Sequence, residues 1–153
     1  MEVREGGLDD PRVQRLLELH VGRARAETAR GSAHALDLSS LRGPGIEFWT
    51  VWEDGQPLGT GALKHLGDGE FEVKSMYTAE HCRRRGIGSA ILSHLIAVCR
   101  KRSARRVNLE TGSWQYFGPA VALYRKHGFV DCLPFADYVA DPNSIFMTLD
   151  LEA

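Results

Sequence analysis

Apolar residues recur at helical spacing in three stretches of the chain. The first begins at Asp10-Pro11, a side-chain acceptor followed by proline that is typical of a helix start, and continues to about residue 28. The second, over residues 87–99, predicts an amphipathic helix of about four turns. The third covers residues 119–127 and is followed by Gly128, a residue type that commonly closes a helix.

Strand-like segments and turn signals occupy much of the remaining chain. Residues 48–52, 58–66 and 70–78 are separated by Asp54-Gly55 and by Gly67-Asp68-Gly69, and this pattern predicts an antiparallel meander. Residues 34–41 predict a short helix or an irregular loop. The weaker strand predictions are residues 1–8, 107–109, 129–130 and 144–151.

The order of these elements predicts the fold class. A helix between two strands favours local parallel pairing, whereas the meander favours antiparallel pairing elsewhere. We therefore expect an α/β fold with a central mixed, mostly antiparallel sheet flanked by helices. A chain of 153 residues fits one domain, residues 1–153.

Composition and charge exclude several classes of protein. The formal net charge of −1 gives no basis for nucleic-acid binding by charge alone, so we expect no nucleic-acid partner. No apolar run approaches the length of a membrane-spanning helix, and residues 1–10 lack the apolar core of a signal peptide, so we expect no membrane partner. The three cysteines and six histidines show no ligand spacing, so we expect no metal, and reduced thiols in the cytoplasm.

Positive charge is concentrated where the second helix begins. Between His81 and Leu109 the chain has eight basic residues and no acidic one: Arg83, Arg84, Arg85, Arg100, Lys101, Arg102, Arg105 and Arg106. Although such a block is usually a solvated face, here three of the arginines precede Gly86-Ile87-Gly88. Because a helix N-terminus exposes unpaired N–H groups and glycine allows close approach, this turn predicts a site for a diphosphate.

Two familiar glycine motifs do not fit this turn. A P-loop requires Lys-Ser/Thr after its last glycine, but Ser89-Ala90 follows Gly88. The dinucleotide fingerprint requires a third glycine, where Ile91 stands, and a strand that runs directly into the turn.

The remaining pattern, Arg83-x-x-Gly86-x-Gly88, resembles motif A of the GNAT superfamily of acyl-CoA N-acyltransferases. Leu123-Tyr124 followed by Gly128-Phe129 resembles the second signature of that family, and residues 73–78 resemble the strand that precedes motif A. The chain is closer still to a small bacterial branch of acetyltransferases. The segments that carry this closer resemblance are His34–Asp37, Glu110–Ser113, Pro134–Tyr138 and Phe146-Met147.

The resemblance implies a binding site for acetyl-CoA. Backbone groups of Met76, Tyr77 and Thr78 would bind the pantetheine arm and polarise the thioester carbonyl. Phe117 stands where many members have asparagine, so an aromatic wall would replace a polar contact to that arm. The residues expected at the diphosphate are Arg83, Arg84, Arg85, Gly86, Ile87, Gly88 and Ser89.

The resemblance also implies catalytic roles. Tyr124 is placed as the proton donor to the leaving sulfur, although a packing role on the helix face is the alternative. Glu72 is our expected general base, with a solvent-facing position as the alternative and Glu70, Glu110 and His34 as competitors. The residues expected to bind the acceptor are His34, Asp37, Glu110, Trp114 and Tyr138, of which the first two could instead cap a helix and the aromatic two could be core.

The resulting functional hypothesis is an N-acetyltransferase that moves an acetyl group from acetyl-CoA to the amine of a small molecule by direct attack in a ternary complex. One alternative is a non-catalytic acetyl-CoA-binding sensor or interaction module. The other is an N-acetyltransferase of proteins or peptides. Homodimers are common in the family, so a homodimer is compatible with the resemblance.

Overall fold

In a computed structural model that describes residues 1–152, seven strands form one sheet in the order β1-β2-β3-β4-β5-β7-β6. Only the β4–β5 pair is parallel, so the predicted mixed, mostly antiparallel sheet is confirmed. The strands are β1 (Glu2–Glu5), β2 (Ile46–Glu53), β3 (Gln56–Gly67), β4 (Glu70–Thr78), β5 (Arg106–Gly112), β6 (Val130–Asp131) and β7 (Ser144–Asp150).

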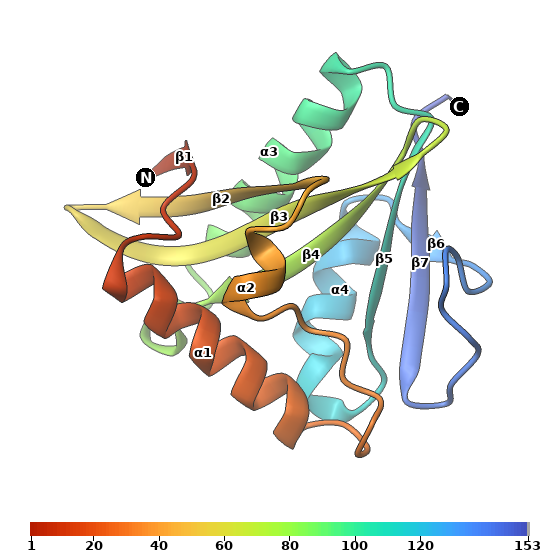
Figure 1. The fold of residues 1–153 in the computed structure, drawn as a ribbon, viewed down its shortest axis with the longest axis horizontal. Coiled ribbons are helices and arrows are strands. Elements are labelled where there is room, and N and C mark those ends of the chain that lie inside the picture. Colours follow the sequence, from red (N-terminus) through yellow and green to blue (C-terminus); the bar gives the residue numbers. More distant parts are fainter. Residues whose placement is uncertain (153) are drawn as a thin grey trace.

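Within the described part of the chain, four α-helices flank the sheet (Figure 1). They are α1 (Pro11–Ala26), α2 (Leu38–Leu41), α3 (Ile87–Lys101) and α4 (Gly118–Lys126), and short 3-10 turns lie at Glu80–Cys82 and Gln115–Phe117. Helix α1 begins as predicted, because the Asp10 carboxylate accepts a hydrogen bond from the backbone N–H of Arg12 at 2.8 Å. Helix α2 is shorter than the predicted segment because Asp37 caps it, so residues 34–37 remain irregular.

Two hydrophobic clusters hold the helices on opposite faces of the sheet. The smaller joins α1 and α2 to β2 and β3 through Val13, Leu17, Leu41, Phe48 and Trp52. The larger holds α3 against the other face through side chains that include Ile87, Ile91 and Leu95. Within residues 1–152, no helix is long and apolar enough to cross a membrane.

Two glycines in β3 bring α3 close to the sheet. A Cβ atom added to Gly59 would lie 2.8 Å from Cγ2 of Ile87, and one added to Gly61 would lie 2.7 Å from Cγ1 of Ile91. Real Cβ atoms do not approach other atoms so closely, so a side chain at either position would displace the helix. The glycines therefore fix where the N-terminus of α3 lies against the sheet.

A β-bulge in β4 opens the sheet next to that helix. Lys74 pairs with Ala62 and Tyr77 with Thr60, so Ser75 and Met76 together oppose a single residue of β3. Ser75 has a φ of 56°, in the left-handed region that residues other than glycine rarely adopt. Bulges bend a strand, and here the β4–β5 pairing ends at Val73 although both strands continue.

Candidate active site

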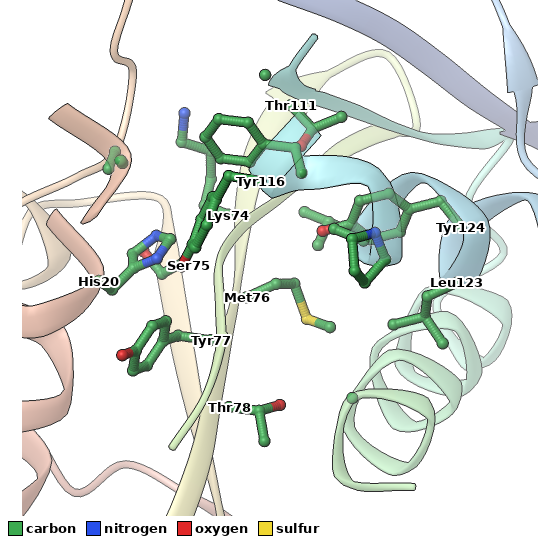
Figure 2. A pocket seen from close by; sticks show the side chains of 18 of the residues that line it. His20, Lys74, Ser75, Met76, Tyr77, Thr78, Thr111, Tyr116, Leu123 and Tyr124 are labelled. Carbon is green, nitrogen blue, oxygen red and sulfur yellow. The ribbon is translucent and has the colours of Figure 1, made fainter. Parts of the chain in front are cut away.

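A cavity of about 630 Å³ occupies the opening between β4 and β5. Figure 2 shows Lys74 and Tyr77 of β4 projecting toward α1, where His20 lies, whereas Met76 and Thr78 project toward α3 and α4. The cavity therefore reaches both faces of the sheet through one gap. Residues of α1, the segment 28–35, β4, β5, the start of α3 and α4 line it.

The N-terminus of α3 lies at the wall of the cavity on the α3 side. Gly86 precedes the helix with a φ of 78°, and no side chain caps the first N–H groups, which are therefore available to a ligand. The cavity is lined here by Arg83, Arg84, Gly86, Ile87, Gly88 and Ser89, all of them predicted site residues. The geometry suits an anion, since the backbone N–H groups and the positive end of the helix dipole lie beside two arginines that line the same cavity.

Arg85 is the exception among the predicted anion-site residues. Its guanidinium pairs with the Glu53 carboxylate and also approaches the sulfur of Cys82 at 3.7 Å. These contacts direct Arg85 away from the cavity, whose lining does not include it. Ser89 lines the cavity, but its hydroxyl is also 2.9 Å from Nε2 of His127.

Tyr124 of α4 faces the cavity close to Met76 and Leu123 (Figure 2). Only 6% of its surface is exposed, so it both packs in the core and contacts the cavity. Burial, and then the charge of Glu110, raise the pKa of the Tyr124 hydroxyl well above its usual range. The phenol is therefore protonated at neutral pH and has a proton to donate.

Glu110 of β5 lines the cavity on the α1 side of the sheet. Burial raises the pKa of its carboxyl group above the ordinary value of 4.5, and the neighbouring Glu72 charge acts in the same direction. Ser144, and then His34 and Lys74, lower this pKa. A carboxylate of raised pKa that faces the same cavity as Tyr124 can act as a proton acceptor opposite a proton donor.

The structure does not bring Glu72 to the cavity. Glu72 is only 1% exposed, and its Oε2 accepts a hydrogen bond from the Tyr138 hydroxyl at 2.6 Å. The same Oε2 lies 3.3 Å from Nζ of Lys74. Lys74 in turn donates to the Tyr138 hydroxyl at 2.8 Å and to the backbone carbonyl of His34 at 3.1 Å. Glu72 thus belongs to a buried network that ties β4 to two loops.

The predicted acceptor-binding residues separate into two groups. His34 and Glu110 line the cavity, and the His34 ring packs edge-on against Tyr138 with ring centroids 5.0 Å apart. Asp37 does not line it, since its Oδ1 accepts from the backbone N–H of Ser40 at 2.8 Å as a helix cap. Trp114 is 43% exposed, lies outside the lining and donates to Asn143 at 3.0 Å.

The residues predicted to contact the pantetheine arm lie together at the cavity. Tyr116, which the sequence analysis did not indicate, lies beside them. Met76, Tyr77, Thr78 and Phe117 all line the cavity. Tyr116 lines it too, and its hydroxyl accepts a hydrogen bond from Nη2 of Arg83 at 3.2 Å. The guanidinium of Arg23 lies over the Tyr116 ring, 4.8 Å from its centroid. Tyr116 therefore connects α1 to the predicted anion-binding turn, a link between distant segments that no local pattern reveals.

Comparison with known proteins identifies the class to which this fold and cavity belong. The model of the acetyltransferase (GNAT) family matches residues 13–129, most of the chain, so the protein belongs to this family and is an acyltransferase. A relative from Escherichia coli K12, the uncharacterized N-acetyltransferase YedL, is 45% identical over 97% of this chain and 94% of its own.

Solved structures agree with this assignment. A candidate acyl-CoA N-acyltransferase from Klebsiella pneumoniae superposes with a TM-score of 0.80 and 28% identity over 98% of this chain and 97% of that one. The ribosomal-protein-alanine N-acetyltransferase of Brucella melitensis superposes with a TM-score of 0.71 over 99% of this chain and 100% of that one. At 20% identity the second likeness shows the fold alone.

Proposed function

We propose that this protein transfers an acetyl group from acetyl-CoA to the amine of a small molecule by direct attack in a ternary complex. The observation that carries the proposal is the single cavity through the β4–β5 opening. One side of it has an uncapped helix N-terminus with arginines, and the other has the half-buried carboxylate of Glu110. The acetyl donor and the acceptor amine can therefore meet in the opening between β4 and β5, and the reaction needs no covalent enzyme intermediate.

The donor would lie along β4 on the α3 side. Its diphosphate would be bound by the N–H groups at Gly86–Ser89, with Arg83 and Arg84 supplying further charged donors. Beyond Val73, β4 lacks its β5 partner, so backbone groups of Met76–Thr78 on that edge would be free for the pantetheine arm. Phe117 would give the arm an apolar wall.

The reaction requires two proton transfers, and we assign one to Glu110 and the other to Tyr124. The acceptor enters as an ammonium ion, and Glu110 takes one proton so that the neutral amine can attack the thioester carbonyl carbon. A C–N bond forms, the C–S bond of the tetrahedral intermediate breaks, and Tyr124 gives its proton to the departing thiolate sulfur. The second proton that the amine nitrogen loses as the amide forms would return to the Tyr124 phenolate. We place the base at Glu110 rather than Glu72 because Glu110 contacts the cavity, whereas Glu72 is enclosed by Tyr138 and Lys74.

The walls of the acceptor side favour a small molecule over a peptide. Residues 33–35 line the cavity, and the Lys74 ammonium binds the His34 carbonyl, so this loop is attached to β4. Two hydrogen bonds attach the loop before β7 as well. The Tyr138 hydroxyl donates to the Glu72 carboxylate, and the Ser32 hydroxyl donates to the Asp141 carboxylate at 2.6 Å. An extended peptide would have to displace these contacts.

Calorimetric titration with acetyl-CoA, followed by thiol release with amino acids, polyamines, aminoglycosides and peptides, tests the proposal. We expect binding of acetyl-CoA and thiol release with at least one small amine. No binding at millimolar cofactor would contradict it. Binding without thiol release from any acceptor would indicate the sensor alternative, and release with peptides alone would indicate a protein acetyltransferase.

A further inference from the structure

Among the described residues, the wall of the cavity contains one acidic side chain and four lysines and arginines. The acid is Glu110, and the basic residues are Lys74, Arg83, Arg84 and Lys126. A cationic group that leaves water needs a charged partner, because an unpaired buried charge is costly. Glu110 can pair with one ammonium group. A second ammonium group on the same acceptor would therefore meet no carboxylate on the cavity wall.

The acidic residues close to the acceptor side that do not line the cavity already have partners. They are Glu27, Glu72, Glu80 and Asp141. Oε2 of Glu72 lies 3.3 Å from Nζ of Lys74. The carboxylates of Glu27 and Glu80 lie 3.6 and 3.8 Å from the guanidinium of Arg23, and that of Asp141 accepts the hydrogen bond from Ser32. These carboxylates do not replace the missing partner of a second cation.

His20 of α1 lies on the acceptor side, toward which Lys74 and Tyr77 project (Figure 2). The ring centroids of His20 and Tyr77 are 5.4 Å apart, and the Arg83 guanidinium lies 6.0 Å from the same Tyr77 ring. Burial and then the Lys74 charge lower the pKa of His20 to about 4, so the imidazole is neutral at physiological pH. A cation beside His20 would thus meet the positive charges of Lys74 and Arg83.

We infer that the acceptor carries a single cationic group, the amine that is acetylated, and that His20 is a residue that determines this specificity. The part of the acceptor beside His20 would carry no positive charge, and the imidazole can donate or accept a hydrogen bond with a polar group there. Diamines, polyamines and aminoglycosides would be poor acceptors. This inference rests on the proposed function and narrows its substrate class.

Pairs of acceptors that differ by one positive charge test the inference. Thiol release from acetyl-CoA is measured at neutral pH with aminobutanol and putrescine, with aminopentanol and cadaverine, and with norleucine and lysine. In each pair the second compound has an additional ammonium group. We expect the first compound to have the higher kcat/KM by about tenfold or more in every pair that is acetylated. The second amine of each diamine, which can also react, works against this expectation.

Substitutions in α1 separate a local effect of charge from a general one. His20→Asp adds a carboxylate at the cavity and should shift the preference toward the diamine by about fivefold or more. His20→Asn adds no charge and should keep the preference of the wild type. Leu19→Asp is the matched control, because Leu19 is 39% exposed, lies outside the cavity lining and receives the same charge one residue earlier. It should change the preference by less than about twofold.

Each outcome bears on one of the two proposals. Absence of thiol release with every small amine would contradict the proposed acetyl transfer. If a diamine equals or exceeds its partner in the wild type, the inference is overturned and the proposed transfer is not. If no pair is acetylated, the active amines of the wider panel decide in the same way, by whether they carry one cationic group or several.

The variants test the role of His20 itself. Thermal melts show whether each variant is folded. A folded His20→Asp without a shift toward the diamine, or an equal shift in Leu19→Asp, would overturn the role of His20 in specificity. If His20→Asp does not fold, the comparison of the pairs in the wild type still decides whether a second cation is excluded.

Discussion

Tyr124 and Glu110 are the two residues to which we assign opposite proton-transfer roles, and their surroundings support that assignment. Both are largely buried beside one cavity, and burial favours the uncharged form of each. A neutral phenol can donate a proton, and a carboxylate of raised pKa accepts one more readily than an exposed carboxylate does. The Leu-Tyr…Gly-Phe signature indicated Tyr124, whereas the choice between Glu72 and Glu110 depended on contacts that only the fold reveals.

We predict that Tyr124→Phe lowers kcat by about 100-fold or more, a typical contribution of a positioned general acid. The affinity for acetyl-CoA should change little, because the variant keeps the ring that packs against Phe129. Steady-state kinetics and calorimetry on the same preparation separate these effects. An unchanged kcat would show that Tyr124 is a packing residue.

The raised pKa of Glu110 predicts the pH dependence of the reaction. A general base is inactive when protonated, so kcat/KM should fall as pH decreases through a pKa above the ordinary carboxyl value of 4.5. Glu110→Gln should lower kcat/KM and abolish this decrease at low pH. Glu70→Gln is the control, because the Glu70 carboxylate bonds Asn108 and lies outside the cavity lining, and this variant should retain the decrease. Retention of the decrease in Glu110→Gln would mean that another group is the base.

At the scale of secondary structure, the sequence predicted the helices and most strands well because their signals are local. The Asp10-Pro11 start, the apolar period of α3 and the turns of the β2–β4 meander all lie within a few residues. The β-bulge was not predicted, since a serine with a φ of 56° has no sequence signature. Yet this bulge accompanies the opening between β4 and β5 and hence the whole cavity.

The turn before α3 gives a prediction with a closely matched control. Gly86 has a φ of 78° at the anion site, and Gly55 has a φ of 74° in the β2–β3 turn; a Cβ atom meets no neighbour within 4 Å at either. Gly86→Ala and Gly55→Ala should therefore each cost about 1–2 kcal/mol of stability. Only Gly86→Ala should weaken acetyl-CoA binding, which thermal melts with and without cofactor would measure. Equal weakening in both variants would exclude a local role for Gly86.

In the whole molecule, the acceptor side is assembled from residues far apart in the chain. The buried network of Glu72, Lys74 and Tyr138 joins β4 to the loop before β7, and Lys74 also holds the loop at His34. Sequence patterns indicated Tyr138 as a pocket residue, but it lies outside the cavity lining, and they did not reveal its hydrogen bond to Glu72. Such partners, 66 positions apart, depend on the complete fold.

A second long-range contact predicts how stability responds to acid. The Glu47 carboxylate of β2 is hydrogen-bonded to Arg102, which follows α3, and to His65 of β3. These two bonds, that of Arg102 more than that of His65, lower the pKa of Glu47 to about 2. The contribution of the Glu47 carboxylate to the free energy of unfolding should be complete at pH values above its unfolded-state pKa of 4.5, and it should be lost as the pH falls toward 2. Urea unfolding should therefore separate wild type from Glu47→Gln at pH 7 more than at pH 3. An equal separation at both pH values would contradict this assignment.

A crystal structure of the protein with acetyl-CoA is the most direct test of the central claim, that the donor lies along β4 on the α3 side with its thioester at the β4–β5 opening. We predict diphosphate oxygens within hydrogen-bonding distance of the N–H groups at Gly86–Ser89. We also predict a thioester near Met76, with the Tyr124 hydroxyl close to the sulfur and Glu110 across the gap. Acetyl-CoA bound elsewhere, or with its sulfur pointing away from Tyr124, would contradict the account.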